Sequence, residues 1–159
     1  MATNYAKAWV AVGDEANWER GFENGIWGLV PKLENHWKRM QSGDLILFYC
    51  KTPIKGFVGA GIIRSRFRQT QPYWKEELEA GSVIWPFRFE FDTTHLIPLD
   101  KWCQLAVSNK PFNTAILAGI SPVKNLDIAD FRYNLLKKLG YIPKEILDFW
   151  QKSINVLYF

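Results

Sequence analysis

The chain has 159 residues, of which 48% are hydrophobic and 16% aromatic, including eight Trp, so it is long and apolar enough for one folded domain with its own core. This composition excludes a disordered chain, and its longest apolar run is far shorter than the roughly 20 residues of a membrane-spanning helix, so we expect no membrane contact and a cytoplasmic location. The formal net charge of +4 is a mild basic bias, compatible with a polyanionic partner.

The first part of the chain predicts a strand followed by a helix. Residues 5–12 are apolar on both faces toward their end, which is typical of a central strand. Asp14 is the expected N-cap of the helix, because its side-chain oxygen can accept a hydrogen bond from a free backbone N–H of the first turn. Trp18 and Phe22 lie four residues apart, so they share one face of the helix, which we expect to pack against the core.

A tryptophan between glycines follows this helix. Asn17 and Asn24 lie on a different helical face, which carries amide groups and little bulk. The sequence G-I-W-G at positions 25–28 predicts a bend that presents Trp27 beside that face. Trp27 could line a flat slot for a planar ligand, or it could pack in the core beside Trp18.

Three strands are predicted in the middle of the chain. A loop at 29–34 and a short helical turn at 35–40 lead to an apolar strand at 44–51. A long strand at 57–68 follows, and a third strand at 82–96 shows alternating Phe residues, so one of its faces should be core and the other polar. Between the last two strands, a loop carries Trp74 and ends in a helical turn.

Three arginines alternate along the strand at 57–68. Arg64, Arg66 and Arg68 should therefore point to one face at intervals of about 6.5–7 Å, which is near the spacing of successive phosphates on an extended nucleic-acid strand. An ordinary solvated sheet edge would have the same pattern. Lys51 and Arg88 are further basic candidates for phosphate contact.

The last third of the chain predicts helices. Residues 100–104 and 111–118 indicate short helices, and a clear helix begins at Asp127 and stops at Gly140. A last helix is expected from about Pro143. We predict one domain over residues 1–159, and the apolar end at Phe159 favours a fragment of a longer protein.

The sequence lacks the usual marks of an enzyme. No Ser or Cys lies in a nucleophile motif near a His, and no phosphate-binding glycine loop is present. Cys50 and Cys103, like His36 and His95, are far apart, so we expect reduced thiols, no metal site and no cofactor. A binding module is the favoured class.

The pattern N-W-E-x-G-x-x-N-G-I-W-G at positions 17–28, followed by a basic loop and S-G-D-L-I-L-F-Y at 42–49, resembles the EVE domain. EVE domains are similar in fold to YTH domains and belong to the PUA-like group. The resemblance covers roughly residues 5–91. It implies an α+β fold, a small barrel-like mixed sheet with flanking helices, and a pocket for a modified base.

The resemblance also implies roles for individual residues. Trp27 matches the first Trp of a YTH-like aromatic cage, and the backbone at Gly28 would meet the exocyclic group of the base. Asn17 matches an Asn that reads the base edge, and Trp74 and Trp85 lie near the second and third cage positions. The spacing at Trp85 departs from the YTH pattern, so it could be core instead. The complete set of base-binding candidates is Trp27, Gly28, Asn17, Trp74, Trp85 and Asn24.

These expectations combine into a functional hypothesis. The domain would flip one modified base into an aromatic cage, and N6-methyladenine in DNA is the first choice of ligand. It would be a monomer and would act as the specificity domain of a McrB-type restriction system, in which the nuclease is a separate subunit. A 5-methylcytosine or 5-hydroxymethylcytosine reader, a stand-alone RNA or transfer-RNA binder, and a structural domain with its pocket closed by Trp27 are the alternatives. N6-methyladenine comes first because the placement of Trp27 and Asn17 resembles that in YTH domains. Against the unmodified base, an enclosed methyl group adds only about 1 kcal/mol, so groups that read the base edge would supply the rest.

Overall fold

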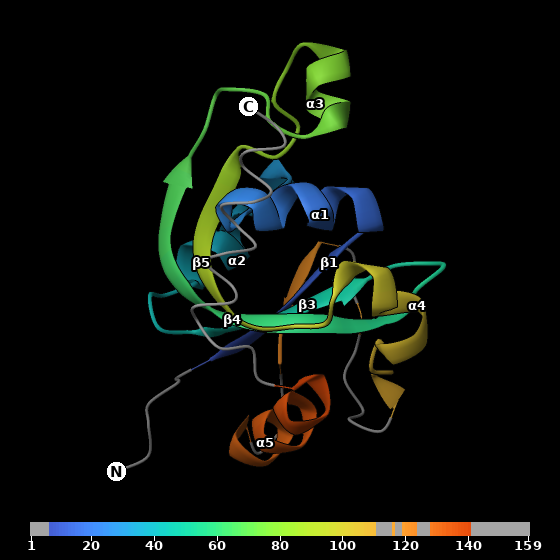
Figure 1. Ribbon diagram of the computed structural model, residues 1–159. Helices are drawn as coiled ribbons and strands as arrows, with labels where there is room; N and C mark the ends of the chain where they lie inside the picture. The colour runs from blue at the N-terminus through green and yellow to red at the C-terminus, as the bar shows by residue number, and fades with distance from the viewer. Residues whose placement is uncertain (1–6, 111–115, 117–118, 124–127, 141–159) are drawn as a thin grey trace.

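A six-stranded mixed sheet dominates the computed structural model, which describes residues 7–110, 116, 119–123 and 128–140 (Figure 1). The strand order is β2-β5-β4-β3-β1-β6, with β1 parallel to β3 and every other neighbouring pair antiparallel. The strands are β1 (Ala8–Gly13), β2 (Ile26–Leu29), β3 (Leu45–Cys50), β4 (Gly56–Arg68), β5 (Phe87–Leu96) and β6 (Ile120–Pro122).

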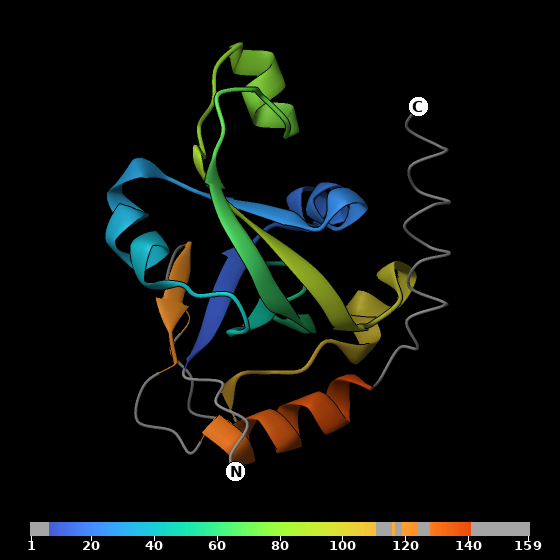
Figure 2. The same ribbon diagram turned by 90° about the vertical axis from the view of Figure 1, so that its left-hand side faces the viewer.

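The long strand β4 bends the sheet into a half-barrel. Its pairing with β5 shifts register twice, and such bulges increase the local twist of a sheet. Helices flank this sheet, with α3 at one end of the molecule and α5 at the other (Figures 1 and 2). The predicted α+β fold with a small barrel-like mixed sheet is therefore confirmed. The helices are α1 (Glu15–Asn24), η1 (Pro31–Leu33), α2 (Glu34–Arg39), α3 (Lys75–Ala80), η2 (Leu99–Lys101), α4 (Trp102–Leu105) and α5 (Ile128–Leu139).

The helix α1 packs against the inner face of the sheet, as its sequence predicts. Asp14 Oδ1 accepts a hydrogen bond from the Asn17 N–H at 2.8 Å, which confirms the N-cap. Trp18 is completely buried, and its ring stacks on Phe22 at 5.3 Å between centroids. The Trp18 indole N–H also donates to the Tyr49 carbonyl oxygen at 2.9 Å, so the helix is tied to β3.

The prediction of a bend at residues 25–28 is wrong for most of that segment. Only Gly25 turns, with a φ of 64° that ends α1, whereas Ile26–Leu29 forms the edge strand β2. Trp27 lies opposite Phe89 and Gly28 opposite Arg88 in the pairing of β2 with β5. Four residues that include a glycine are too few to show strand periodicity in the sequence.

Other boundaries differ in smaller ways. The strand expected at 82–96 begins at Phe87, because Pro86 has no N–H for pairing. The C-terminal helix ends before Gly140, which has a φ of 76°, as predicted. The start of the strand expected at 5–12, most of the helix at 111–118 and the last helix from Pro143 lie outside the described residues. Among the helices that the structure describes, none has the length and apolar character needed to cross a membrane.

Candidate functional site

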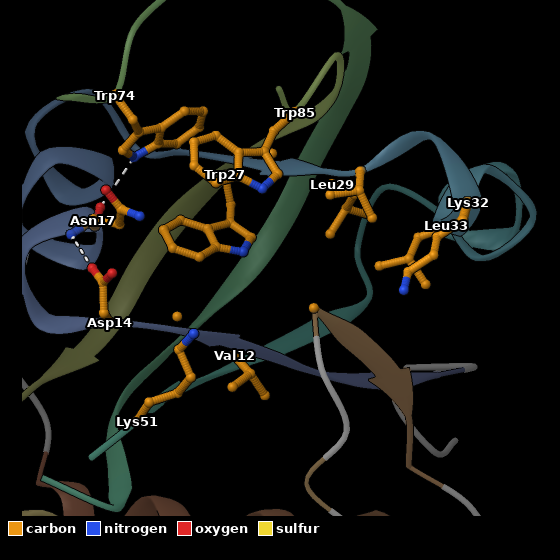
Figure 3. Close-up of a pocket in the computed structure, with 14 residues that line it drawn as sticks. Val12, Asp14, Asn17, Trp27, Leu29, Lys32, Leu33, Lys51, Trp74 and Trp85 are labelled. Carbon is orange, nitrogen blue, oxygen red and sulfur yellow. Dashed lines mark hydrogen bonds between the residues drawn. The ribbon is translucent and has the colours of Figure 1, made fainter. Parts of the chain in front are cut away.

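A pocket of about 230 Å³ opens where β1, β2 and the start of α1 meet the loop that precedes β5 (Figure 3). This volume is just below the roughly 300–1,000 Å³ of pockets for drug-sized ligands, so it suits one small, flat group. The lining residues are Val12, Gly13, Asp14, Asn17, Trp27, Gly28, Leu29, Val30, Lys32, Leu33, Lys51, Trp74, Trp85 and Gly119.

Three tryptophan rings form one corner of this pocket. The Trp74 ring stands nearly perpendicular to the rings of Trp27 and Trp85, at 80° and 81°, with a centroid distance of 5.6 Å in both cases. Trp27 is held from behind by Trp18, whose ring is stacked on it at 3.8 Å and 12°. Trp27 and Trp74 are 6% and 1% exposed, whereas Trp85 is half-buried. The rings of Trp27 and Trp74 are therefore fixed by packing, and Trp85 offers the most accessible ring surface of the three.

Two glycines create the space that these rings occupy. A Cβ atom at Gly13 would overlap the six-membered ring of Trp27. A Cβ atom at Gly28 would lie 2.6 Å from Trp85 Cβ and 3.0 Å from Trp74 Cζ3. Neither glycine has a positive φ, so the requirement at both positions is steric.

The polar groups of the pocket surround this corner. The Asn17 backbone oxygen accepts the Trp74 indole N–H at 3.1 Å, and its side-chain amide donates to Glu76 at 3.3 Å. Asp14 caps α1 as described above. Lys32 and Lys51 are exposed, and in Figure 3 the Lys51 side chain extends from the opposite wall toward Trp27. The pocket thus combines an aromatic corner with hydrogen-bonding and cationic groups.

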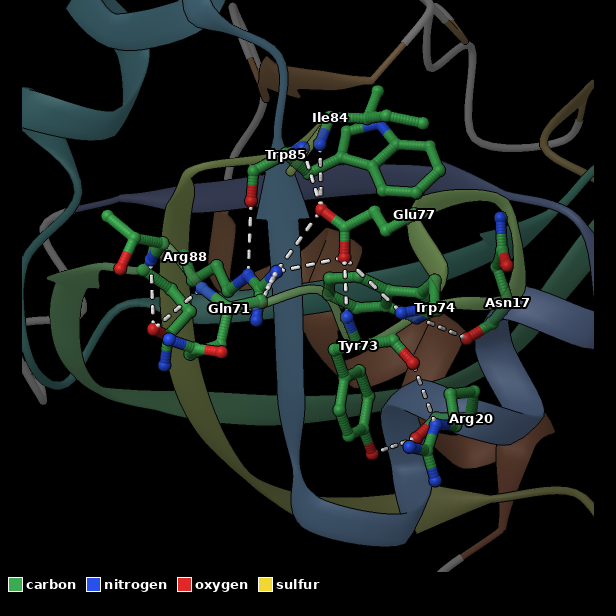
Figure 4. A network of polar contacts seen from close by, with 11 residues as sticks. Asn17, Arg20, Gln71, Tyr73, Trp74, Glu77, Ile84, Trp85 and Arg88 are labelled. Atoms are coloured by element: carbon green, nitrogen blue, oxygen red, sulfur yellow. Dashed lines mark hydrogen bonds and ion pairs between the residues drawn. The ribbon is translucent and has the colours of Figure 1, made fainter. Parts of the chain in front are cut away.

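A buried ion pair that sequence reasoning missed lies directly behind the corner (Figure 4). The Glu77 carboxylate and the Arg88 guanidinium are 2.9 Å apart and are 0% and 2% exposed. Burial alone would raise the pKa of Glu77, but N–H donors from four backbone groups hold that pKa below its ordinary value. Glu77 lies three residues after the N-cap residue Trp74, the position of the Glu in a capping box, but Trp replaces the usual Ser or Thr, so the sequence carried only half of that signal.

Contacts from α1 hold the same loop on its other side. The Tyr73 hydroxyl donates to the Arg20 carbonyl oxygen at 2.7 Å, and the Arg20 guanidinium lies 3.9 Å above the Tyr73 ring. Asn24 donates to the Tyr73 hydroxyl at 2.8 Å and does not line the pocket. We therefore assign Asn24 to holding Tyr73, in place of the expected base contact.

The predicted basic residues divide into two groups. The assignment of Arg88 to phosphate contact is wrong, because its guanidinium is buried and bound to protein groups. The loop that precedes β5 covers the strand face on which Arg88 lies. The alternation of apolar and polar residues along the strand does not reveal this loop. Lys51, Arg64, Arg66 and Arg68 are exposed, as a phosphate contact requires.

The exposed arginines have partners of their own. Arg64 lies 2.8 Å from Glu90 and 3.4 Å from Asp92. Arg66 donates to the Trp37 carbonyl oxygen at 2.8 Å. Arg68 lies 4.8 Å above the Phe87 ring and 3.8 Å from Glu34, which follows the pocket residue Leu33. Two of the three are therefore held beside α2, on the side of the pocket formed by η1.

Among the residues that the structure describes, no three His, Cys, Asp or Glu side chains are grouped in a way that could hold a metal ion. Cys50 is buried and Cys103 is exposed, and both are free thiols, in line with their wide separation in the sequence. Their environments differ strongly, since burial raises the pKa of the Cys50 thiol to about 12.

Comparison with known proteins places the fold. No family model matches the chain, and no curated protein matches its sequence. A Toxoplasma CPSF4 YTH domain in complex with a 7-mer m6A-modified RNA is 15% identical, with a TM-score of 0.54 over 89% of this chain and 95% of that one. The Pho92 YTH domain in complex with m6A is 16% identical, with a TM-score of 0.52 over 84% and 85%.

An ASCH protein from Zymomonas mobilis is also similar, at 12% identity and a TM-score of 0.51 over 81% of this chain and 95% of that one. At such identities the likeness concerns the fold. The chain therefore has the fold shared by YTH and ASCH domains, and the YTH-like fold is the one that the resemblance over roughly residues 5–91 implied.

Proposed function

We propose that this domain binds nucleic acid by holding one flipped, modified base in the pocket formed by Trp27, Trp74 and Trp85. The observation that carries this proposal is the right-angled corner of three Trp rings beside an opening of about 230 Å³. Stacking on an aromatic side chain contributes about 1–3 kcal/mol per base, which can offset the few kcal/mol that removing a base from its stack costs.

Selection of the modified base needs more than stacking. Enclosing one methyl group contributes about 1 kcal/mol, or roughly a fivefold preference over the unmodified base. Hydrogen bonds to the base edge would supply the remainder, and Asn17, Lys51 and the backbone of Gly28 line the pocket where such bonds can form. A site whose polar groups require a partner rejects ligands that lack one much more strongly than an apolar site does.

N6-methyladenine in DNA is the first candidate ligand. Two YTH domains of the same fold were solved with m6A, and the EVE-like pattern at residues 17–28 supports a role as the specificity domain of a McrB-type restriction system. RNA is the second candidate, favoured by the methylated RNA bound to the Toxoplasma domain. Modified cytosine is the alternative base. We propose a binding role alone, with any GTPase or nuclease activity in other domains or subunits.

Phosphate contacts would supply affinity without choice of base. Lys32 and Lys51 line the pocket, and Arg66 and Arg68 extend the basic surface along α2. Each neutralised phosphate releases counterions, so this part of the affinity should fall steeply with salt.

The test is a titration at fixed salt with short oligonucleotides that differ in one central base. The set contains adenine, N6-methyladenine, cytosine, 5-methylcytosine and 5-hydroxymethylcytosine, each in DNA and in RNA. The wild type should prefer one modified base by about fivefold or more. Trp85→Ala should abolish that preference, whereas Leu105→Ala, at an exposed apolar residue outside the pocket, should retain it. Equal binding of all bases by the wild type would refute the proposal.

A further inference from the structure

The Glu77 carboxylate joins two backbone segments that carry pocket tryptophans. Its Oε1 atom accepts hydrogen bonds from the N–H groups of Tyr73 and Trp74 at 2.9 and 3.3 Å. Its Oε2 atom accepts from the N–H groups of Ile84 and Trp85 at 2.9 and 3.1 Å. One side chain thus holds the backbone positions of Trp74 and Trp85, which are separated by α3 (Figure 4).

Arg88 completes the same connection from β5. Its guanidinium donates to the carbonyl oxygens of Trp85 at 3.1 Å and Gln71 at 3.0 Å, in addition to Glu77. It also lies 5.0 Å above the centre of the Trp74 ring. The two charged side chains therefore link both ends of the loop to the strand that pairs with β2, where Trp27 is located.

Stability alone does not explain a buried ion pair. Apolar residues of similar volume often give an equal or greater free energy of unfolding at such a position. What apolar residues cannot do is hold four particular N–H groups and two carbonyl oxygens in one arrangement. Trp85 depends on this arrangement most, since its side chain is only half-buried and packing covers it incompletely.

We propose that Glu77 and Arg88 are specificity-determining positioning residues, which hold Trp74 and Trp85 at the separation that distinguishes a modified base from an unmodified one. This inference rests on the proposed function. Neither side chain lines the pocket, so both act through the two tryptophans. Loosening the pair should leave phosphate contacts intact and reduce the preference for the modified base.

The chain offers a matched control for a buried carboxylate. Asp44 is 2% exposed, accepts the Trp9 indole N–H at 3.0 Å and the Gln41 backbone N–H at 2.9 Å, and does not line the pocket. Asp44→Asn and Glu77→Gln therefore make the same chemical change, one away from the tryptophan corner and one behind it.

The first measurement needs no ligand. In ¹⁵N spectra of the Trp indole groups, Glu77→Gln should shift or broaden the signals of Trp74 and Trp85 and leave that of Trp102 unchanged. Asp44→Asn should shift the signal of Trp9 and leave the two pocket signals in place. Unchanged Trp74 and Trp85 signals in Glu77→Gln would overturn the proposal, whatever the protein binds.

The second measurement is the ratio of affinities for oligonucleotides with a modified and an unmodified central base, compared at equal folded fraction. Glu77→Gln should lower the wild-type ratio by about fivefold, the equivalent of one enclosed methyl group, with little change in binding of the unmodified oligonucleotide. Asp44→Asn should retain the ratio. Equal ratios in Glu77→Gln and the wild type would overturn the positioning role.

Arg88→Lys provides a second variant if Glu77→Gln does not fold. It keeps the charge but lacks the planar set of donors that reaches Trp85, Gln71 and Glu77 together, so it should lose the preference as well. A wild-type ratio in Arg88→Lys would overturn the proposal for Arg88. If the wild type itself shows no preference, the proposed function and this inference are both refuted, whereas a preference that survives in both variants refutes the inference alone.

Discussion

Gly28→Ala should damage the pocket through a single added methyl group. That group would lie 2.6 Å from Trp85 Cβ, about 1 Å inside the roughly 3.5–4.0 Å at which carbon atoms pack best, and 3.0 Å from the Trp85 carbonyl oxygen. Gly28 lies in the paired strand β2, and the Trp85 backbone is hydrogen-bonded to Glu77 and Arg88, so neither can move aside freely. We therefore expect a loss of about 1–3 kcal/mol in the free energy of unfolding. Without the clash, replacing glycine would stabilise the protein by about 0.4–1 kcal/mol.

The same displacement should reduce binding of a base. If the wall formed by Trp85 moves, one stack worth about 1–3 kcal/mol weakens, which corresponds to roughly 5- to 150-fold in affinity for the modified oligonucleotide. Urea unfolding and the oligonucleotide titration measure the two effects. Gly61→Ala is the control, because its Cβ would overlap the Asp92 carbonyl oxygen, away from the pocket. If Gly28→Ala had wild-type stability and binding, the contact between position 28 and Trp85 would not control the pocket.

Three further predictions concern charge and reactivity. The backbone donors lower the pKa of Glu77, so its stabilisation should be complete above the ordinary carboxyl pKa of about 4.3 and be lost as the pH falls through the lower folded value. The difference in free energy of unfolding between wild type and Glu77→Gln, measured with urea, should therefore shrink on acidification. A constant difference would contradict this. A thiol reagent at about pH 8 should label Cys103 in the native protein and Cys50 only after denaturation, because burial raises the pKa of Cys50 to about 12. Rapid labelling of both thiols would show that solvent reaches β3 in the native protein. Arg66→Gln and Arg68→Gln should each lower the slope of log affinity against log salt by about one without changing the base preference, and an unchanged slope would remove them from the phosphate contacts.

Local sequence signals predicted much of the fold correctly because their physical causes are local. Asp14 caps α1 through a hydrogen bond three residues along the chain, and Trp18 and Phe22 share a face because of helical geometry. The main strands have long apolar or alternating runs of residues that fit no other type of secondary structure. The edge strand β2 had no such run, and only its pairing with β5 defines it.

The candidate site was predictable only in part, for the same reason. The resemblance to YTH-like domains suggested Trp27 as one wall and Trp74 as another. Their relation to each other depends on the pairing of β2 with β5 and on the loop that folds over that pair. Arg88 shows the limit, since alternation predicts an exposed side chain and the covering loop buries it against Glu77.

Elements that form from contacts within a few residues, such as the capped helix and the long strands, could be read from the amino-acid order. Which tryptophans meet, which basic residues remain exposed, and how a buried carboxylate joins two halves of a loop became clear only from the folded molecule. The physical reason is that burial and hydrogen bonding across the sheet depend on residues far apart in the chain, such as Trp27 and Trp74, whose meeting no local pattern encodes.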